Sequence, residues 1–388
     1  MMKEITVTGR ERLLATFRRE RPDRVPVAPF IYYNNVYELF GYQPRIVDYM
    51  DPVDFDVITQ FVAYCRHYGF DVLHTLGSAW DACTLGASWD NWDVTVATEG
   101  NDDELQRVTI ARTPGGTLRQ IVSLKRSSPH LVVAATEEYP LKDGSDFDLY
   151  ARYAPPAERL DVSLVQRARA AVGESGVVAS FAQGAFNALA FLRRLDDALM
   201  DPLVDEGLYR SMISYFVDRL VGQGRKVVEA GAEVVEVGGN LATGCVGPRF
   251  FADYVLEYER QVIAGLKAAG AYVIYHNCGD ADRIMHLYND LGADCWGYLT
   301  PPPYGDVDLD KALRVMRPDL VLRGNIDQVT FLREASPAEI RARVAELLVR
   351  VKPRGHFVLS TTDFMFDGTP RENIRALADA GREFGAYD

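Results

Sequence analysis

The sequence lacks several features that would place it in a membrane, secreted or nucleic-acid-binding class. None of its apolar runs is long enough to cross a bilayer, and its first residues lack the long apolar segment of a signal peptide. A formal net charge of −13 leaves little basic surface for neutralising phosphates. We therefore expect a cytoplasmic protein that binds neither membranes nor nucleic acids.

Cysteine is scarce, and its five copies are widely scattered. An odd number of cysteines in a long chain of this kind is not a disulfide framework. Four of them are expected to be ordinary packing residues, and Cys278 differs because His276 is its neighbour. No glycine-rich phosphate fingerprint follows the first expected strand, which argues against a dinucleotide-binding fold.

What the chain does have is a large apolar content and a regular alternation of strands and helices. Of its 388 residues 48% are hydrophobic, enough for a large core. Strands that alternate with helices pair in parallel through helical crossovers. The expected strands cover residues 24–31, 71–76, 177–182, 233–238, 271–276, 294–298, 320–325 and 356–360. Close to eight such units predict an α/β fold, a (β/α)₈ TIM barrel forming one domain over residues 1–388, with an open doubly wound sheet as the alternative.

Helix boundaries are marked by caps and prolines. Thr8 and Glu11 have the spacing of a capping box, and Pro22 follows the helix that they open. Further helices are expected over residues 52–68, 199–230, 250–269, 281–291, 308–316, 337–351 and 371–384.

Residues 87–141 interrupt this alternation. Four segments of strand character are joined there by Asn/Asp and Pro-Gly-Gly turns, which predicts an antiparallel β excursion. The stretch just before it, 78–92, is rich in Trp, Gly and Ser. It is either a lid or an ordinary long loop.

The stretch His276-Asn-Cys278-Gly closes one of the expected strands. Residues two apart on an extended backbone point the same way, so His276 and Cys278 share a face. An imidazole beside a thiol supplies half of a zinc site. A core histidine next to a packing cysteine is the alternative interpretation.

Polar residues recur at the carboxyl ends of the other strands, which is where barrel enzymes collect their chemistry. These strand-end residues are Tyr32, Asn34, His74, Gln183, Glu236, His276, Cys278, Tyr298, Asn325, Asp327 and Asp363. Any one of them taken alone can be a helix cap or a strand-end hydrogen bond, an interpretation that weighs most for Asn325 and Asp327. Asp367 is expected to cap the final helix or the turn before it.

A catalytic zinc site needs three protein ligands and one open position. Asp363, just past the last expected strand, is a candidate for the third ligand. Glu236, one strand before His276, is the other candidate.

Several motifs together resemble the uroporphyrinogen decarboxylase superfamily and, within it, the branch of zinc-dependent corrinoid methyltransferases and O-demethylases. The motifs are 8–15, 21–26, His276-Asn-Cys278-Gly, 301–309, Arg323-Gly-Asn-Ile-Asp327 and 370–373. The resemblance covers nearly the whole chain and implies a (β/α)₈ barrel whose site lies at the strand carboxyl ends. The motifs identify the superfamily and leave the substrate open.

Two departures from the family pattern bear on the substrate. The decarboxylases carry an Arg-rich stretch after the first strand, whereas residues 30–35 of this chain contain no arginine, so porphyrinogen decarboxylation is not expected. In the thiol-directed methyltransferases, His-x-Cys and a later Cys bind zinc. His276 and Cys278 match the first two, and Asp363 stands where the later cysteine falls. The carboxylate leaves zinc feasible and argues against a thiol substrate.

The resemblance implies a zinc-dependent methyltransferase that moves a methyl group from an O-methyl donor, a methoxyarene, to a corrinoid. Tyr298, Tyr32 or His74 would donate a proton or hydrogen bond to the departing oxygen. Trp80 and Trp89 would hold the ring, although core packing explains these tryptophans equally well. Asn34, Gln183 and Asn325 would complete the substrate site. Because the chain lacks an Asp-x-His-x-x-Gly signature, cobalamin would arrive on a partner protein.

Other readings of the same residues stay open. The first is a metal-free decarboxylase or lyase that acts on a small carboxylic acid. The second is a noncatalytic protein that binds a corrinoid carrier. The oligomeric state is open as well, and the resemblance makes a homodimer one possibility because members of the family often form dimers.

Overall fold

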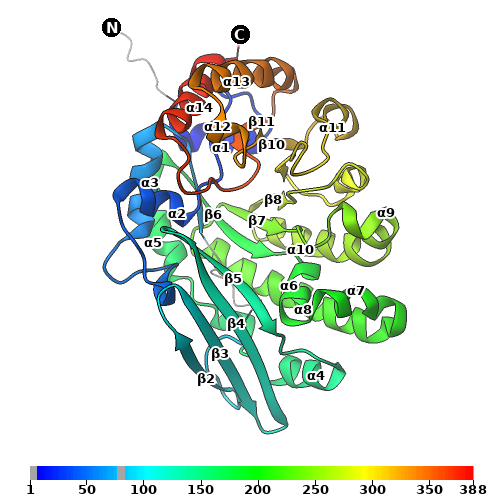
Figure 1. Ribbon diagram of the computed structural model, residues 1–388. Helices are drawn as coiled ribbons and strands as arrows, with labels where there is room; N and C mark the ends of the chain where they lie inside the picture. Colours follow the sequence, from blue (N-terminus) through cyan, green and yellow to red (C-terminus); the bar gives the residue numbers. More distant parts are fainter. Residues whose placement is uncertain (1–6, 77–83, 388) are drawn as a thin grey trace.

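Seven parallel strands form a curled sheet at the centre of the computed structural model, which describes residues 7–76 and 84–387 (Figure 1). Their order in the sheet is β1-β6-β7-β8-β9-β10-β11. The strands are β1 (Val72–Leu76), β6 (Gly176–Gln183), β7 (Val234–Gly238), β8 (Tyr272–His276), β9 (Cys295–Gly297), β10 (Val321–Ile326) and β11 (Phe357–Thr361). Each expected strand from residue 71 onward in the alternating part of the chain is present.

The segment that was expected as the first strand, 24–31, closes the ring between β11 and β1. Ala28 N–H donates to Leu359 O at 2.9 Å, and Asp71 N–H donates to Val27 O at 2.9 Å. The segment is extended but is not a regular strand, because Pro26 and Pro29 have no N–H to add to a ladder. With this segment the sheet has eight positions, and the predicted (β/α)₈ architecture is confirmed.

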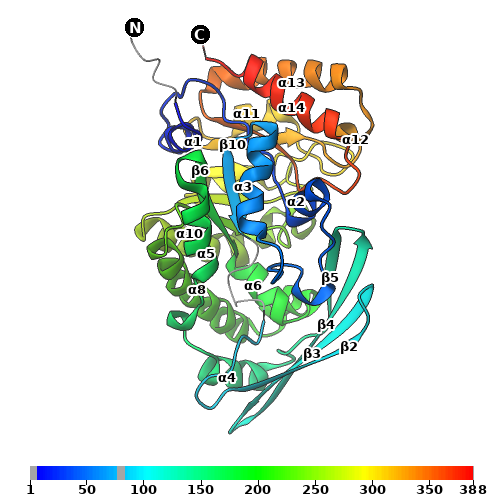
Figure 2. The same ribbon diagram turned by 90° about the vertical axis from the view of Figure 1, so that its left-hand side faces the viewer.

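Helices cover the outside of this ring (Figures 1 and 2). They are α2 (Tyr33–Phe40), α3 (Val57–Tyr68), α5 (Ser163–Val172), α6 (Ala185–Leu192), α7 (Leu195–Val204), α8 (Glu206–Glu229), α9 (Gly247–Phe250), α10 (Leu256–Ala268), α11 (Leu309–Val315), α12 (Phe331–Glu334), α13 (Pro337–Val351) and α14 (Arg371–Phe384). The expected boundaries 337–351 and 371–384 agree with α13 and α14.

Four expected helices differ in extent or type. In the expected helix 250–269, Phe251–Val255 form a π-helix and the α-helix begins at Leu256. The expected helix 199–230 is divided at Asp205, whose carboxylate accepts from Leu208 N–H at 3.0 Å and so starts α8 afresh. Asp56 caps α3 in the same way, so that helix begins at Val57 instead of residue 52. The segment 281–291 forms only a 3₁₀ helix over Met285–Asp290.

The first helix, α1 (Gly9–Phe17), seals one end of the barrel. The predicted capping box is present, with the Thr8 side chain accepting from Glu11 N–H. Leu13 and Phe17 pack against the first inward-facing residues of the strands, among them Val234 and Ile274. Figure 2 shows α1 on the side of the barrel opposite α2. The amino ends of the strands are therefore closed by apolar packing.

The predicted β excursion is a separate antiparallel sheet of order β2-β3-β4-β5, below the barrel in Figure 1. Its strands are β2 (Asp93–Gly100), β3 (Glu104–Thr113), β4 (Gly116–Ser128) and β5 (Leu131–Glu138), and α4 (Gly144–Tyr153) follows. The turn between β4 and β5 is attached to the barrel, because Asp367 accepts from Ser128 Oγ at 2.6 Å and His130 N–H at 2.8 Å.

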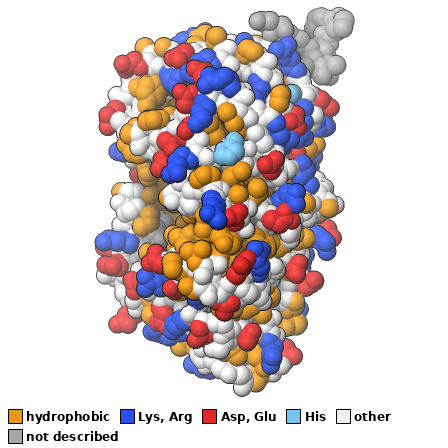
Figure 3. All heavy atoms as spheres, turned by 90° about the vertical axis from the view of Figure 1, so that its right-hand side faces the viewer, with side chains coloured by type: hydrophobic (Ala, Val, Ile, Leu, Met, Phe, Trp, Pro, Cys, Tyr) orange, Lys and Arg blue, Asp and Glu red, His pale blue; other side chains and the backbone are white. Residues whose placement is uncertain are grey.

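Apolar side chains gather in the middle of the face shown in Figure 3. On that side α7 exposes Met200, Leu203 and Val204, each more than half accessible. Within the described ranges, no helix is long and apolar enough to cross a membrane.

Asp71 ties the closing segment to its neighbours, and its replacement tests how the ring is closed. Its carboxylate, almost fully buried, accepts from Arg12 Nη1 at 2.6 Å, Arg24 Nη1 at 2.9 Å and Val27 N–H at 2.9 Å. Asp71→Asn leaves the Arg24 guanidinium without its counter-charge and leaves Arg12 with Asp23 alone. We expect it to lower the free energy of unfolding by about 3–5 kcal/mol. Urea unfolding followed by circular dichroism measures the change.

Asp196→Asn is the matched control, since Asp196 pairs with Arg194 at 3.1 Å on the open surface. Its effect should stay within about 0.5 kcal/mol. Equal stabilities for the Asp71 variant and the unmodified protein would contradict this account of ring closure.

Candidate metal centre

The barrel interior changes from apolar to polar between its two ends. Val234, Ile274 and Val321 point inward near α1, and two residues further along the same strands come Glu236, His276 and Arg323. Inward positions recur every second residue, so the three polar side chains form one layer across β7, β8 and β10. All three are buried, Glu236 and Arg323 fully.

Glu236 is the centre of this layer. Its Oε1 accepts hydrogen bonds from His276 Nδ1 at 2.7 Å and from the Tyr298 hydroxyl at 2.8 Å. Its Oε2 accepts from Arg323 Nη1 at 3.1 Å. The Arg323 guanidinium also lies 4.4 Å from the centre of the Tyr298 ring. A buried carboxylate needs such partners, because an unpaired charge in the interior is very costly.

These contacts move the pKa values of both partners in opposite directions. Burial opposes the charged form of Glu236, but the charge of Arg323 and the bond from His276 outweigh it, so its pKa lies below the ordinary value. Burial also opposes the imidazolium of His276, but contacts with Cys278 and Glu236 outweigh it and raise the pKa of His276 to about 10. In the metal-free protein the pair is therefore ionic at neutral pH.

His276, Cys278 and Asp363 bring one ligand atom each to a common point. The three atoms all lie within 4.8 Å of one another. Because His276 Nδ1 is bound to Glu236, Nε2 is the ring nitrogen left for a metal. Nitrogen, sulfur and carboxylate oxygen donors suit a zinc ion. Three donors beside a cavity are the arrangement of a metal site with an open coordination position.

The loop after β11 places Asp363. Asp363 N–H donates to Gln328 Oε1 at 3.1 Å, and its own carboxylate accepts from Phe364 N–H at 2.7 Å. Further along, Asn34 Nδ2 donates to Met365 O and to Asp367 Oδ1, both at 2.9 Å. Burial raises the pKa of Asp363 above its ordinary value.

Aromatic rings surround the imidazole of His276. Phe181 and Phe30 meet it edge to face with ring centres 5.5 and 5.9 Å away, and Tyr298 lies at 4.8 Å. Phe30 also stacks on Tyr298 and contacts Phe364. Water is thus excluded from one side of the cluster.

On the other side the cluster opens into a cavity of about 230 Å³. Apart from Cys278 and Asp363, the described residues that line it are apolar or neutral polar, and none of them is Lys or Arg. The lining residues are Cys278, Gly279, Thr300, Tyr304, Gln328, Val329, Thr362, Asp363, Phe364 and Phe366. A cavity of this size and charge suits one uncharged ring, and its described lining offers no cationic side chain to a polycarboxylate.

The residues expected to act on substrate at the first strand have other contacts. The Tyr32 ring packs on Phe364 at 5.2 Å, but its hydroxyl is directed to Met50 Sδ at 3.3 Å. Asn34 holds the loop of Asp363 and is fully buried. Both residues lie at the start of α2, after the extended segment. They contact the loop that carries Asp363 and do not line the cavity.

His74 does not reach the mouth of the barrel. Its ring stacks on Phe61 of α3 at 4.1 Å, and Nε2 lies 3.3 Å from Ile58 O. The odd-numbered Leu73 faces the barrel interior, so the even-numbered His74 must face the helix layer. Its expected role as a proton donor is therefore not supported, and burial lowers its pKa to about 4.

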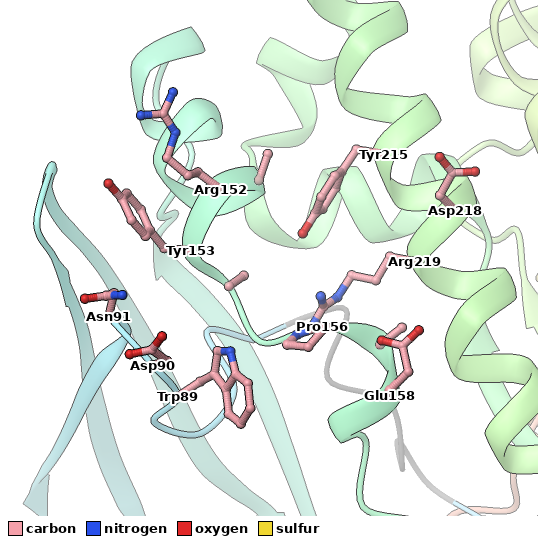
Figure 4. Close-up of a pocket in the computed structure, with 13 residues that line it drawn as sticks. Trp89, Asp90, Asn91, Arg152, Tyr153, Pro156, Glu158, Tyr215, Asp218 and Arg219 are labelled. Carbon is pink, nitrogen blue, oxygen red and sulfur yellow. The ribbon is translucent and has the colours of Figure 1, made fainter.

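The remaining predicted substrate residues are dispersed. Gln183 accepts from Asn187 Nδ2 at 3.1 Å at the end of β6, and Asn325 is buried at the end of β10. Trp80 lies outside the described residues. Trp89 lines a second cavity of about 610 Å³, which shares no lining residue with the first (Figure 4). The Arg159 guanidinium lies 4.3 Å from the centre of the Trp89 ring.

Sequence reasoning missed Arg323, Gln328 and Phe30. Arg323 carried a signal, because an arginine inside an apolar strand needs a buried counter-charge. Gln328 and Phe30 had no comparable signal, since their roles depend on which loops meet at the mouth.

Fold and site together define a (β/α)₈ barrel with a His/Cys/Asp cluster at the carboxyl ends of its strands. The uroporphyrinogen decarboxylase (URO-D) family pattern matches residues 133–384, about two thirds of the chain. The chain belongs to the uroporphyrinogen decarboxylase family.

Curated relatives include both decarboxylases and methyltransferases. The chain is 27% identical over 180 residues to the uroporphyrinogen decarboxylase of Solibacter usitatus, covering 46% of this chain and 50% of the relative. It is 21% identical over 180 residues to the methylcobamide:CoM methyltransferase MtbA of Methanosarcina acetivorans, again 46% and 50%. The chain thus spans about half the length of the curated relatives it matches.

A methyltransferase from Methanosarcina mazei has the same fold. Its solved structure aligns with a TM-score of 0.72 and 17% identity, covering 98% of this chain and 99% of that one.

The two buried histidines give opposite predictions for pH titration. In chelator-treated protein His276 should keep its proton up to pH about 10, whereas His74 should stay neutral down to pH about 4. Since the His276 pKa is raised above its unfolded value of about 6.5, its stabilising contribution is complete below that pH. It is lost as the pH rises through about 10. NMR of the ring nitrogens reports both groups.

Glu236→Gln removes the carboxylate that stabilises the imidazolium, so the pKa of His276 should fall and that of His74 should not move. An unchanged His276 titration in this variant would disprove the coupling.

Proposed function

We propose that this chain is a zinc-dependent methyltransferase that moves a methyl group from a methoxyaromatic donor to a corrinoid carried by a partner protein. The observation that carries the proposal is the convergence of His276, Cys278 and Asp363 within 4.8 Å beside an aromatic-lined cavity. Family membership and the likeness to a methylcobamide-dependent relative support the same class.

Each proposed ligand has a defined support. His276 Nε2, Cys278 Sγ and an Asp363 oxygen would hold the metal, and Glu236 would keep the imidazole in the tautomer that presents Nε2. Glu236 is therefore proposed as the positioning residue and Asp363 as the third ligand. The two oxygens of Glu236 already accept three hydrogen bonds.

A zinc ion bound there would supply a Lewis acid for the oxygen that gains negative charge when its bond to the methyl group breaks. The chain's own residues hold the ring and exclude water. Phe364 and Phe366 form the apolar wall of the cavity, and Phe30 and Phe181 cover the imidazole. The Tyr298 hydroxyl donates a hydrogen bond to the same Glu236 oxygen that accepts from His276 Nδ1. Tyr298 therefore helps to hold the carboxylate that orients His276.

The lining of the cavity favours an ether over an acid or a thiol. Within residues 7–76 and 84–387 no Lys or Arg lines it, and Arg323 of the inner layer is paired with Glu236. Decarboxylation of an anionic substrate would lack a cationic partner. A carboxylate ligand in place of a second thiolate makes the metal a harder acid, which suits an oxygen donor.

Zinc content tests the ligand set. The purified protein should hold about one zinc ion per chain, and His276→Ala and Cys278→Ala should each lose most of it. Glu236→Gln should keep the ion with an affinity roughly 10- to 100-fold weaker, because only the orientation of the imidazole is lost. Competition with a chromophoric chelator measures these affinities.

Matched controls are His286→Ala and Cys245→Ala, which remove an exposed histidine and an exposed cysteine outside the cluster. Full zinc in both cluster variants would contradict the metal centre. Loss of zinc in Glu236→Gln but not in Asp363→Ala would indicate that Glu236 is the third ligand and that Asp363 is not.

Methyl transfer tests the reaction. With reduced cobalamin and a methoxyarene, the zinc-loaded protein should produce methylcobalamin, detected by its absorption spectrum. Cys278→Ala should lower the rate by at least about 100-fold, and Cys245→Ala should leave it unchanged. Carbon dioxide release from a small acid by the zinc-free protein would instead favour a decarboxylase.

A further inference from the structure

Gln328 lies in the wall of the cavity beside the proposed ligands, and it is almost fully buried. It follows β10 by two residues, and its side chain faces the loop that carries Asp363. Neither the family pattern nor the zinc chemistry assigns it a role.

Hydrogen bonds fix which way its amide points. Gln328 Oε1 accepts from the Thr362 hydroxyl at 2.7 Å and from Asp363 N–H at 3.1 Å. A backbone N–H can only donate, so the atom facing it must be the amide oxygen. Rotating the amide by 180° would set two donors against each other. The Nε2 group therefore has one orientation.

That Nε2 group is left for a ligand. No acceptor in the described part of the chain takes a hydrogen bond from it, and it is not sealed from the cavity. The backbone around it is held in place, because Asp327 accepts from Val329 N–H at 2.8 Å and Phe331 N–H at 3.0 Å. Gln328 thus presents a preoriented, uncharged donor.

The surroundings restrict what the donor can bind. Phe364 and Phe366 line the same cavity and suit a ring, while Asp363 and Cys278 disfavour an anion. A neutral amide donor next to these groups suits a neutral oxygen acceptor such as a carbonyl or a second ether.

We infer that Gln328 determines substrate specificity: its Nε2 donates a hydrogen bond to a neutral oxygen on the aromatic ring of the methyl donor, in addition to the ether that reacts. This inference rests on the proposed function and narrows it to methoxyarenes that carry a second oxygen acceptor.

Equilibrium binding to zinc-loaded protein tests the inference without turnover. The probes are the three isomers of methoxybenzaldehyde, which accept but do not donate, and the matching methoxytoluenes, which have similar size and no acceptor. At least one aldehyde should bind about tenfold more tightly than its toluene counterpart. A methoxybenzoate, which is anionic, should bind more weakly than the aldehyde.

Two variants remove the donor in different ways. Gln328→Glu keeps an oxygen for Thr362 and Asp363 but replaces the NH₂ group, and Gln328→Met is uncharged and apolar. Both should bring the aldehyde-to-toluene ratio to within about twofold of unity while toluene binding is retained. Gln166→Met, which replaces an exposed glutamine of α5 outside the cavity, should leave the ratio unchanged. Zinc content is measured for each variant. If Gln328→Glu loses zinc because of its added charge, the uncharged Gln328→Met still tests the loss of the donor.

The outcomes separate this inference from the function on which it rests. Equal binding of the aldehyde and the toluene to the unmodified protein would overturn the role of Gln328. Equal losses of affinity for both in the Gln328 variants would do the same. Neither result contradicts the proposed methyltransferase activity. Tightest binding by methoxybenzoate overturns the preference for a neutral acceptor. If no methoxyarene binds the zinc-loaded protein, both the proposed class of methyl donor and the inference about Gln328 are wrong.

Discussion

A carboxylate shut away from water constrains the centre of this barrel. Glu236 is fully buried, and its charge is maintained by three donors that come from three other places in the sheet. Removing any donor would leave a buried charge with fewer partners, which is far more costly than losing a surface contact. The positions of His276, Tyr298 and Arg323 are therefore coupled through one carboxylate.

This coupling explains why the candidate site sits where it does. The amino ends of the strands are filled by Leu13 and Phe17 of α1, so the interior there is apolar. The polar layer forms two residues further on, and it is followed by the mouth, where Cys278 and the loop of Asp363 meet the imidazole. The His276 imidazole at the mouth is thus oriented by a charge that lies beneath it, an arrangement that also holds metal-binding histidines in place.

The mouth differs from what a polyanionic substrate needs. Its cavity is small and is walled by Phe364, Phe366, Cys278, Asp363 and neutral polar groups, and the rings of Phe30 and Tyr32 pack against Phe364. The barrel is shared with the Methanosarcina mazei methyltransferase structure, and the curated relatives are of both decarboxylase and methyltransferase type. Function within such a fold is decided by the side chains at the mouth, and here these favour an uncharged aromatic ligand.

The sequence by itself determined the local features. A capping box placed the start of α1, the helix–strand alternation placed α13 and α14, and the two-residue spacing put His276 and Cys278 on one face. The strand-end rule also picked out Asp363. Only the tertiary structure decided that His74 faces α3 and that Asn34 binds a loop from the far end of the chain. It alone assigned Glu236 to the imidazole and Gln328 to the cavity. The physical reason is that a period of two shows which residues share a face, whereas which face turns inward depends on the strands and helices packed on either side.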